Sequence, residues 1–320
     1  MLENDARRQS RAFGLCVRAP FPLPGAPSCD GDRPEPGTLV ALTSAQELDR
    51  LWRGGDREVL VDKRLDNGRL MITVEHRQDL GFRIWMPNYG RYVISPDGSL
   101  MRCALPKVAP RRWQRLLFAQ PLPLAALLQG RTMIHASAVA VADRVLMFIA
   151  PSGTGKTSLA GHLVSRGATL MADDALALEC AGERVLAHAA TGLINIDAKE
   201  LATIAPELRP RLGTHHGHVD KQIMCSSVPE RALPVSRVYF LERGPQVERF
   251  AVQRMLTPDF GPFLGARFFR YVRRPEIWTD YLEVCAGLAA SAELYTVKVP
   301  PGFAAARVAD KIEAQLEKMA

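Results

Sequence analysis

A glycine-rich segment that ends in lysine and threonine constrains this chain more than any other feature. Residues 150–157 read Ala-Pro-Ser-Gly-Thr-Gly-Lys-Thr, between an apolar run at 145–149 and a helical pattern at 158–164. A strand, a glycine-rich turn and a helix in this order are typical of a phosphate-binding loop, or P-loop. Alanine at position 150 replaces the first glycine of the pattern and is small enough to keep the turn tight. A chance glycine-rich turn is the alternative, which the flanking strand and helix disfavour.

The residue types within this segment suit the binding of a nucleoside triphosphate. Glycines allow backbone N–H groups to turn toward phosphate oxygens, and the following helix adds the positive end of its dipole. Lys156 can reach the β- and γ-phosphates, and the Thr157 hydroxyl is a ligand for Mg²⁺. We therefore expect ATP and Mg²⁺ as cofactors. The residues predicted to bind the nucleotide are Ser152, Gly153, Thr154, Gly155, Lys156, Thr157 and Ser158.

Two adjacent carboxylates and a histidine lie close to the loop in the sequence. Residues 168–174 predict a short buried strand that ends at Asp173 and Asp174, and His135 begins another strand that continues over 136–141. Neighbouring carboxylates suit a division of roles, because one can stay ionised on Mg²⁺ while the other exchanges a proton.

These three features together resemble the kinase domain of the HPr kinase/phosphorylase family over about residues 132–179. The resemblance implies an α/β fold with a P-loop kinase domain of HPr kinase type, and phosphoryl transfer from ATP to a serine hydroxyl. It implies Asp173 as the base and Asp174, with Thr157, as the Mg²⁺ ligands. It also places His135 near the phosphates and Asp173, where it would orient or tune them; a hydrogen-bonded strand histidine is the alternative.

Two other segments bear on the acceptor. Residues 191–197 resemble that family's E-I-R-G-L-G-I-I motif, but its charged positions fall on Ala189, Ala190 and Thr191. This departure predicts a one-way kinase and disfavours HPr itself as the substrate. The opening from Ala12 to Gly25 resembles kinases found with ribosomally made peptides, notably lasso peptides.

We therefore expect a serine on a small protein or a ribosomal precursor peptide as the acceptor. Three alternatives stay open: an HPr-type protein serine kinase in carbon regulation, a small-metabolite kinase, and a nucleotide-binding regulatory module without transfer. The carboxylate pair argues against the last, since a pure binding module has little use for a base.

Several other polar residues are candidates for a site. Lys221, in an expected mobile loop, could clamp the transferred phosphoryl group, and a surface lysine is the alternative. The cluster His-His-Gly-His at 215–218 is expected in a loop without the partners that a metal needs. Three arginines, at positions 111, 112 and 115, could bind phosphate, but a solvated basic face is the favoured interpretation.

The remaining pattern predicts two domains. A β-rich N-terminal module over 1–125 is interpreted as a substrate-recognition unit, and 126–320 as the kinase domain, with a helix broken at Pro121 and Pro123 near the boundary. A capping box at Ser44 opens a short helix. The other expected elements are strands at 12–18, 38–42, 58–61, 70–75, 82–85, 92–95, 100–104, 175–179, 185–188, 237–242 (central) and 294–299, and helical segments at 257–292 and 306–319.

Composition excludes several classes of protein. The net charge of +7 suits phosphate-bearing or acidic partners, but the basic residues are spread along the chain and form no nucleic-acid motif. No apolar run reaches membrane-spanning length and no signal peptide is visible. The six scattered cysteines indicate reduced thiols. We expect a cytoplasmic homo-oligomer with no nucleic-acid or membrane partner.

Overall fold

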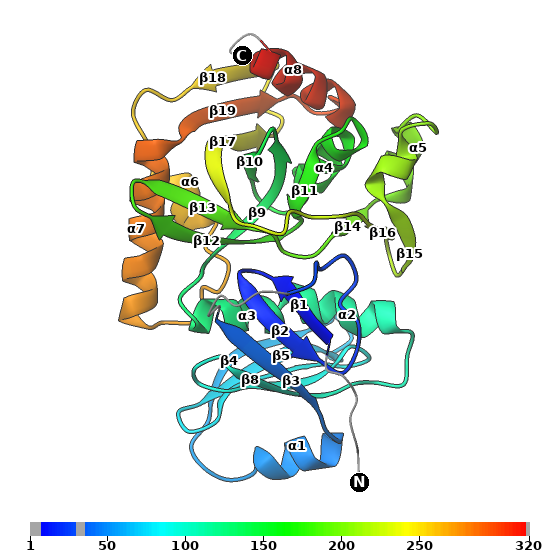
Figure 1. Cartoon of the computed structure of the whole chain (residues 1–320), viewed down its shortest axis with the longest axis vertical. Helices are drawn as coiled ribbons and strands as arrows, with labels where there is room; N and C mark the ends of the chain where they lie inside the picture. Colours follow the sequence, from blue (N-terminus) through cyan, green and yellow to red (C-terminus); the bar gives the residue numbers. More distant parts are fainter. Residues whose placement is uncertain (1–7, 30–35, 318–320) are drawn as a thin grey trace.

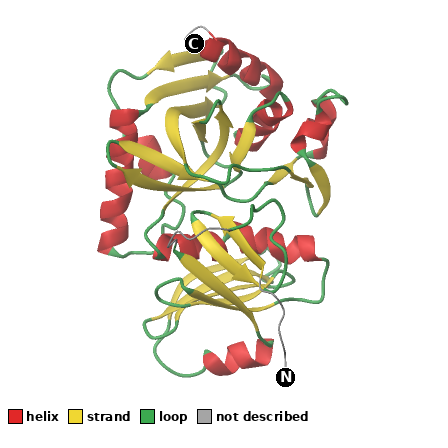
Figure 2. Cartoon of the chain, viewed as in Figure 1, coloured by secondary structure: helices red, strands yellow, loops and turns green. Residues whose placement is uncertain are grey.

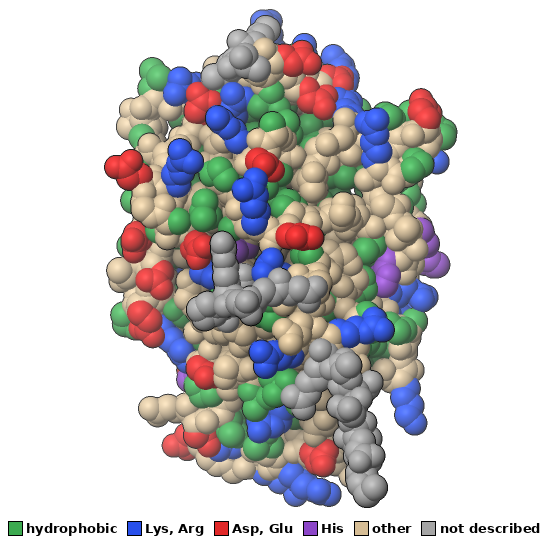
Figure 3. Space-filling view, viewed as in Figure 1, with side chains coloured by type: hydrophobic (Ala, Val, Ile, Leu, Met, Phe, Trp, Pro, Cys, Tyr) green, Lys and Arg blue, Asp and Glu red, His purple; other side chains and the backbone are tan. Residues whose placement is uncertain are grey.

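The computed structural model describes residues 8–29 and 36–317, which form a mixed α/β structure (Figure 1). Figure 2 shows one part built around the N-terminal sheet and a second part that contains the remaining sheets and most of the helices. On the face shown in Figure 3, basic and acidic side chains are interspersed over both parts. This distribution agrees with the spread of charge along the sequence.

The N-terminal part is a sheet of eight strands in the order β1-β2-β3-β8-β7-β6-β5-β4. The strands are β1 (Arg8–Ala12), β2 (Leu15–Ala19), β3 (Gly37–Leu42), β4 (Glu58–Arg64), β5 (Leu70–Arg77), β6 (Gly81–Met86), β7 (Gly90–Ile94) and β8 (Leu100–Ala104). The expected single strand over 12–18 is instead a hairpin of β1 and β2, because Phe13 and Gly14 adopt φ of 56° and 73° and turn the chain. The predicted capping box is confirmed: Ser44 and Glu47 cap α1 (Ala45–Leu51).

Two consecutive helices, α2 (Pro110–Ala119) and α3 (Pro121–Leu128), join the N-terminal sheet to the rest. The predicted break is confirmed, since Gln120 lies between them with non-helical dihedrals. The boundary expected at 125/126 falls inside α3, which packs against both β7 and β9. One apolar core extends from the N-terminal sheet through these helices into the second part.

The second sheet has the order β10-β9-β12-β13-β17-β19-β18, with β11 paired to β9. Its members are β9 (Thr132–Val141), β10 (Arg144–Ile149), β11 (Thr169–Ala172), β12 (Ala175–Ala181), β13 (Arg184–His188), β17 (Leu233–Arg243), β18 (Ala251–Arg254) and β19 (Glu293–Val299). Strand β17 is central, as expected: it runs parallel to β10 and β19 and antiparallel to β13. Because β10 also pairs with β9, the strands β9, β12, β13, β17 and β10 form a closed cycle of pairings.

The helices of this part correct one prediction. They are α4 (Lys156–Ser165), α5 (Ala198–Thr203), a 3₁₀ turn (Arg209–Leu212), α6 (Gly261–Gly265), α7 (Pro275–Ser291) and α8 (Ala305–Glu317). The expected helical stretch over 257–292 is two helices separated by an irregular segment at 266–274. Pro275 starts α7, and the residue before a proline avoids the helical conformation. The end of the helix expected to reach residue 319 lies outside the described residues.

A separate three-stranded sheet, β14-β16-β15, lies beside α4. Its strands are β14 (Leu193–Ile196), β15 (Thr214–His218) and β16 (Gln222–Cys225). The histidine cluster at 215–218 is therefore in a strand and not in a loop, because β15 pairs with β16 through an irregular register at Gly217. Among the described residues, no three or more His, Cys, Asp and Glu side chains gather in a group that could hold a metal ion.

Two further observations concern membrane-spanning helices and disulfide bonds. No helix in residues 8–29 and 36–317 is both long and apolar enough to span a membrane. None of the six cysteines forms a disulfide in the described structure.

Candidate active site

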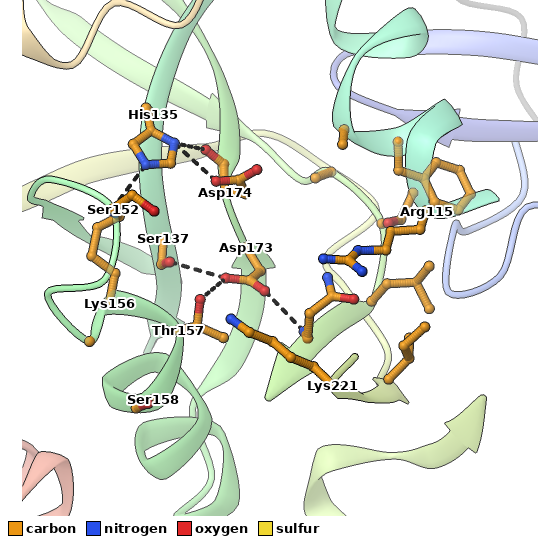
Figure 4. A pocket seen from close by; sticks show the side chains of 18 of the residues that line it. Arg115, His135, Ser137, Ser152, Lys156, Thr157, Ser158, Asp173, Asp174 and Lys221 are labelled. Carbon is orange, nitrogen blue, oxygen red and sulfur yellow. Dashed lines mark hydrogen bonds and ion pairs between the residues drawn. The ribbon is translucent and has the colours of Figure 1, made fainter. Parts of the chain in front are cut away.

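A cavity of about 410 Å³ lies where the glycine-rich loop and Asp173 face helix α2 and the β15–β16 hairpin (Figure 4). Nearly all of the predicted site residues line it: His135, Ser152, Gly153, Gly155, Lys156, Thr157, Ser158, Asp173, Asp174 and Lys221. Thr154 does not; it is buried, and its hydroxyl donates to the Pro151 carbonyl at 2.9 Å. The structure therefore brings together residues that are separated by up to 86 positions in the chain (135 to 221).

The loop itself has the local geometry that an anion requires. Strand β10 ends at Ile149 and helix α4 begins at Lys156, so the loop joins the two directly. Gly153 and Gly155 have φ of 82° and 105°, a region that other residues avoid. The N-cap of α4, Gly155, provides no side-chain cap for the first turn of the helix. Its leading N–H groups are thus left to bind a phosphate group.

Lys156 is almost fully buried, with 6% of its surface exposed. Its Nζ donates to the carbonyl oxygens of Ala150 at 2.7 Å and Pro151 at 3.2 Å, and lies 3.1 Å from His135 Nε2. Burial lowers the pKa of Lys156, while the carboxylates of Asp174 and Asp173 act in the opposite direction. The ammonium is therefore held against the loop at the edge of the cavity.

His135, on β9, connects the lysine to one of the two carboxylates. Its Nδ1 lies 3.0 Å from both Oδ1 and the backbone oxygen of Asp174. Since an ammonium can only donate, His135 Nε2 accepts from Lys156, and we infer that Nδ1 carries the proton donated to Asp174. Asp174 has a φ of 90°, which is unusual for a residue with a side chain. The sequence predicted His135 beside Asp173, whereas its hydrogen-bond contacts are with Asp174.

Asp173 follows β11 and accepts three hydrogen bonds. The hydroxyls of Thr157 and Ser137 donate to Oδ1 at 2.7 and 3.2 Å, and the backbone N–H of Asn195 donates to Oδ2 at 3.0 Å. Burial raises the pKa of Asp173, and the hydrogen bonds from Asn195 and Thr157 partly oppose this. Thr157 thus contacts Asp173, whereas the sequence paired it with Asp174 for Mg²⁺.

Sequence reasoning missed two of these partners. Ser137 lies two positions after His135 on the same strand, so the period of two places both side chains on one face. The alternation of side chains along the strand could have identified Ser137 from the sequence. Asn195 is a polar residue within the apolar strand β14, but it contributes its backbone, for which no side-chain signal exists.

The opposite wall of the cavity comes largely from the β1–β2 turn and from helix α2. Phe13 lies in the turn between β1 and β2, and Arg111, Arg115 and Phe118 project from α2. A solvated basic face was expected here, and this is wrong for Arg111 and Arg115. They lie four residues apart on the same face of the helix and line the cavity, whereas Arg112 points away and is exposed.

Comparison with known proteins finds similarity to solved structures. No family model matches the chain, and no curated protein matches it. The solved structure of the Hpr(Ser) kinase/phosphatase from Coxiella burnetii is similar over 58% of this chain and 97% of that chain, with 13% sequence identity and a TM-score of 0.33. The identity and the TM-score are too low for this similarity to carry an argument about activity, which depends on the residues of the site.

Proposed function

We propose that this protein is an ATP-dependent kinase that phosphorylates a serine hydroxyl on a small protein or a ribosomal precursor peptide. The observation that supports this proposal is the cavity itself. It combines an uncapped helix N-terminus, a lysine, a hydroxyl and two carboxylates within one space. These are the groups that phosphoryl transfer requires, because its catalysis depends on positioning and on charge stabilisation.

The residues present fit ATP and Mg²⁺. The backbone of residues 152–157 and the Lys156 ammonium would hold the phosphates, and Lys221 would clamp the transferred group from the other side. The oxygens of Thr157 and of the two carboxylates are the ligand type that Mg²⁺ prefers. Bound Mg²⁺ and ATP supply the phosphoryl group and neutralise part of its charge.

The contacts favour a division of the carboxylates that is the reverse of the one implied by the family resemblance. Asp173 touches the Thr157 hydroxyl, and its oxygens already accept three hydrogen bonds. Asp174 is exposed to the cavity and has His135 as its partner. A base must first be within reach of the acceptor, so we assign Asp173 to the Mg²⁺ side and Asp174 to the acceptor hydroxyl.

Replacing Lys156 tests the central claim. We expect Lys156→Ala to reduce transfer of labelled phosphate by at least about 10²-fold, because a preorganised charge on the phosphates is lost. The circular dichroism spectrum should stay unchanged. Lys298→Ala, on the edge of β19 and outside the cavity, is the control. Activity of the Lys156 variant within a few-fold of the wild type would rule out the P-loop assignment.

The acceptor is tested by a side-by-side assay. A precursor-type peptide with an exposed serine, the HPr protein and free serine are incubated with the enzyme and Mg²⁺-ATP. We expect the peptide to be the best of the three and no dephosphorylation in the presence of inorganic phosphate. Fast, reversible phosphorylation of HPr would instead favour the carbon-regulation alternative.

A further inference from the structure

The wall of the cavity that faces the glycine-rich loop carries two arginines in addition to Lys221, the proposed phosphate clamp. Arg111, Arg115 and Lys221 line it, and none of the lining residues from α2 or from the β15–β16 hairpin carries a carboxylate. Figure 4 shows Arg115 and Lys221 directed into the cavity from the side opposite the loop. Phe13 and Phe118 supply apolar surface beside them.

Helix α2 fixes this wall by holding the β15–β16 hairpin. Arg111 Nε donates to the His218 carbonyl at 3.0 Å, and His216 Nε2 lies 3.0 Å from Oε1 of the buried Gln114. Arg115 forms an ion pair with Asp220. A guanidinium held by protein contacts loses less freedom when it binds a ligand, so these contacts preorganise the arginines.

The charges on this wall do not cancel. Three cations, Arg111, Arg115 and Lys221, stand against one carboxylate, Asp220, which is paired with Arg115 and is largely exposed. Asp220 also interacts electrostatically with Lys221, so this one carboxylate is shared by two of the three cations. The two half-buried arginines of this wall are favourable partners for a carboxylate, because Arg–carboxylate hydrogen bonds are both charge-assisted and directional.

We propose that the acceptor alcohol carries a carboxylate and that Arg111 and Arg115 bind it, an inference that rests on the proposed kinase function. The hydroxyl then faces the two aspartates while the carboxylate contacts the arginines across the cavity. In a peptide, the carboxylate is the side chain of an acidic residue near the serine or the terminal carboxylate of the chain. Arg111 and Arg115 are therefore specificity residues for the acceptor.

A matched set of peptides tests this proposal. Two amidated peptides contain serine beside either Glu or Gln, and a third has the Gln sequence with a free terminal carboxylate next to the serine. We expect the Glu peptide or the free-carboxylate peptide to have a KM about tenfold or more below that of the amidated Gln peptide. Whichever of the two has the lower KM identifies the carboxylate that the arginines bind, a side chain or the chain terminus. The same ranking is expected for binding of fluorescent peptides, measured by anisotropy without turnover.

Variants of the wall assign this preference to residues. Arg111→Gln and Arg115→Gln should each abolish the preference for a carboxylate and change the KM for ATP by less than about twofold. Arg112→Gln, on the exposed side of the same helix, should have no effect. Asp220→Asn breaks the ion pair but keeps every cation, so it should preserve or strengthen the preference for a carboxylate. If Asp220→Asn instead lost this preference as fully as Arg115→Gln, Arg115 would act only by holding the hairpin.

The outcomes separate this proposal from the function on which it rests. Equal binding and equal KM of all three peptides in the wild-type enzyme would overturn the proposal and leave the kinase assignment standing. The proposal would also be overturned if the arginine variants raised the KM for ATP and not the KM for the Glu peptide. That result would assign the arginines to the phosphates of the nucleotide. Failure of the protein to bind Mg²⁺-ATP would instead contradict the kinase function itself.

Discussion

Asp173 and Asp174 are adjacent in the sequence but have different surroundings. We expect Asp173→Asn to weaken Mg²⁺-ATP binding by about tenfold or more, because its carboxylate lies against the Thr157 hydroxyl. Asp174→Asn should leave binding nearly intact and lower kcat by about 10²- to 10⁴-fold, because a base acts in the transition state. Calorimetric titration with Mg²⁺-ATP and single-turnover kinetics measure the two effects. The opposite result would restore the roles that the family resemblance implies.

The pH dependence of stability reports on Asp173 without any ligand. Burial raises the pKa of this carboxyl, so the folded state binds its proton more tightly than the unfolded state does. The corresponding stabilisation is complete below the usual pKa of aspartate and is lost as the pH rises through the raised value. We therefore expect the unfolding free energy of wild type, relative to Asp173→Asn, to fall as the pH rises above the usual aspartate pKa of about 4. Urea denaturation at several pH values measures it, and a constant difference would contradict the prediction.

The loop residues and the carboxylate pair could be predicted because their chemistry lies within short stretches of sequence. Lys156 and Thr157 follow a fixed pattern, and Asp173 ends a strand that is visible as an apolar run. Arg111 could not be assigned in the same way. Its place in the cavity depends on how α2 packs against the β15–β16 hairpin, more than a hundred positions away in the chain.

At the scale of elements, the contact between α2 and β15 depends on one glycine. A Cβ at Gly217 would lie 2.2 Å from Cδ of Arg111, and the residue has a φ of 135°. Gly217→Ala should therefore destabilise the protein, displace the hairpin and raise the KM for the acceptor. Gly130→Ala is the control, because its φ of 85° is also positive and outside the region that other residues favour, while its Cβ would meet no atom within 4 Å. Urea denaturation compares the two; equal losses of stability would mean that the contact with Arg111 is unimportant.

The elements that could be predicted are those with strong local signals. The capping box at Ser44 and the break at Pro121 are both confirmed. The segment 266–274 was expected to be helical because its aromatic residues follow helical spacing, but Phe269 and Val272 are buried from an irregular backbone. Tertiary packing thus outweighed local periodicity there. The histidine cluster at 215–218 is likewise a strand because it pairs with β16.

At the scale of the whole molecule, the N-terminal part and the second part, which contains the glycine-rich loop, are not independent. The Phe13 N–H donates to the Ala189 carbonyl at 2.8 Å, and a Cβ at Gly14 would lie 2.6 Å from Nε of Arg131. Their apolar cores are continuous. A separable N-terminal module would allow the second part to fold alone. The continuous core does not favour independent folding of the two parts.

Deleting residues 1–110 tests the dependence. We expect the remaining chain to show no cooperative thermal transition, because a large apolar surface of α2 and α3 would face water. Differential scanning calorimetry of the truncated and intact chains gives the answer. A cooperative transition in the truncated chain, with intact Mg²⁺-ATP binding, would show that the N-terminal part is dispensable for folding.

Helix α2 belongs to the connection between the two sheets, while the glycine-rich loop lies within the second sheet. In the proposed function, recognition of the acceptor and binding of the nucleotide would therefore depend on segments about forty positions apart, 111–118 and 150–157. A library that varies the cavity-facing positions of α2, with its buried positions kept, could redirect the enzyme to new acceptors while its ATP chemistry stays constant. The fold thus offers a way to engineer substrate choice separately from catalysis.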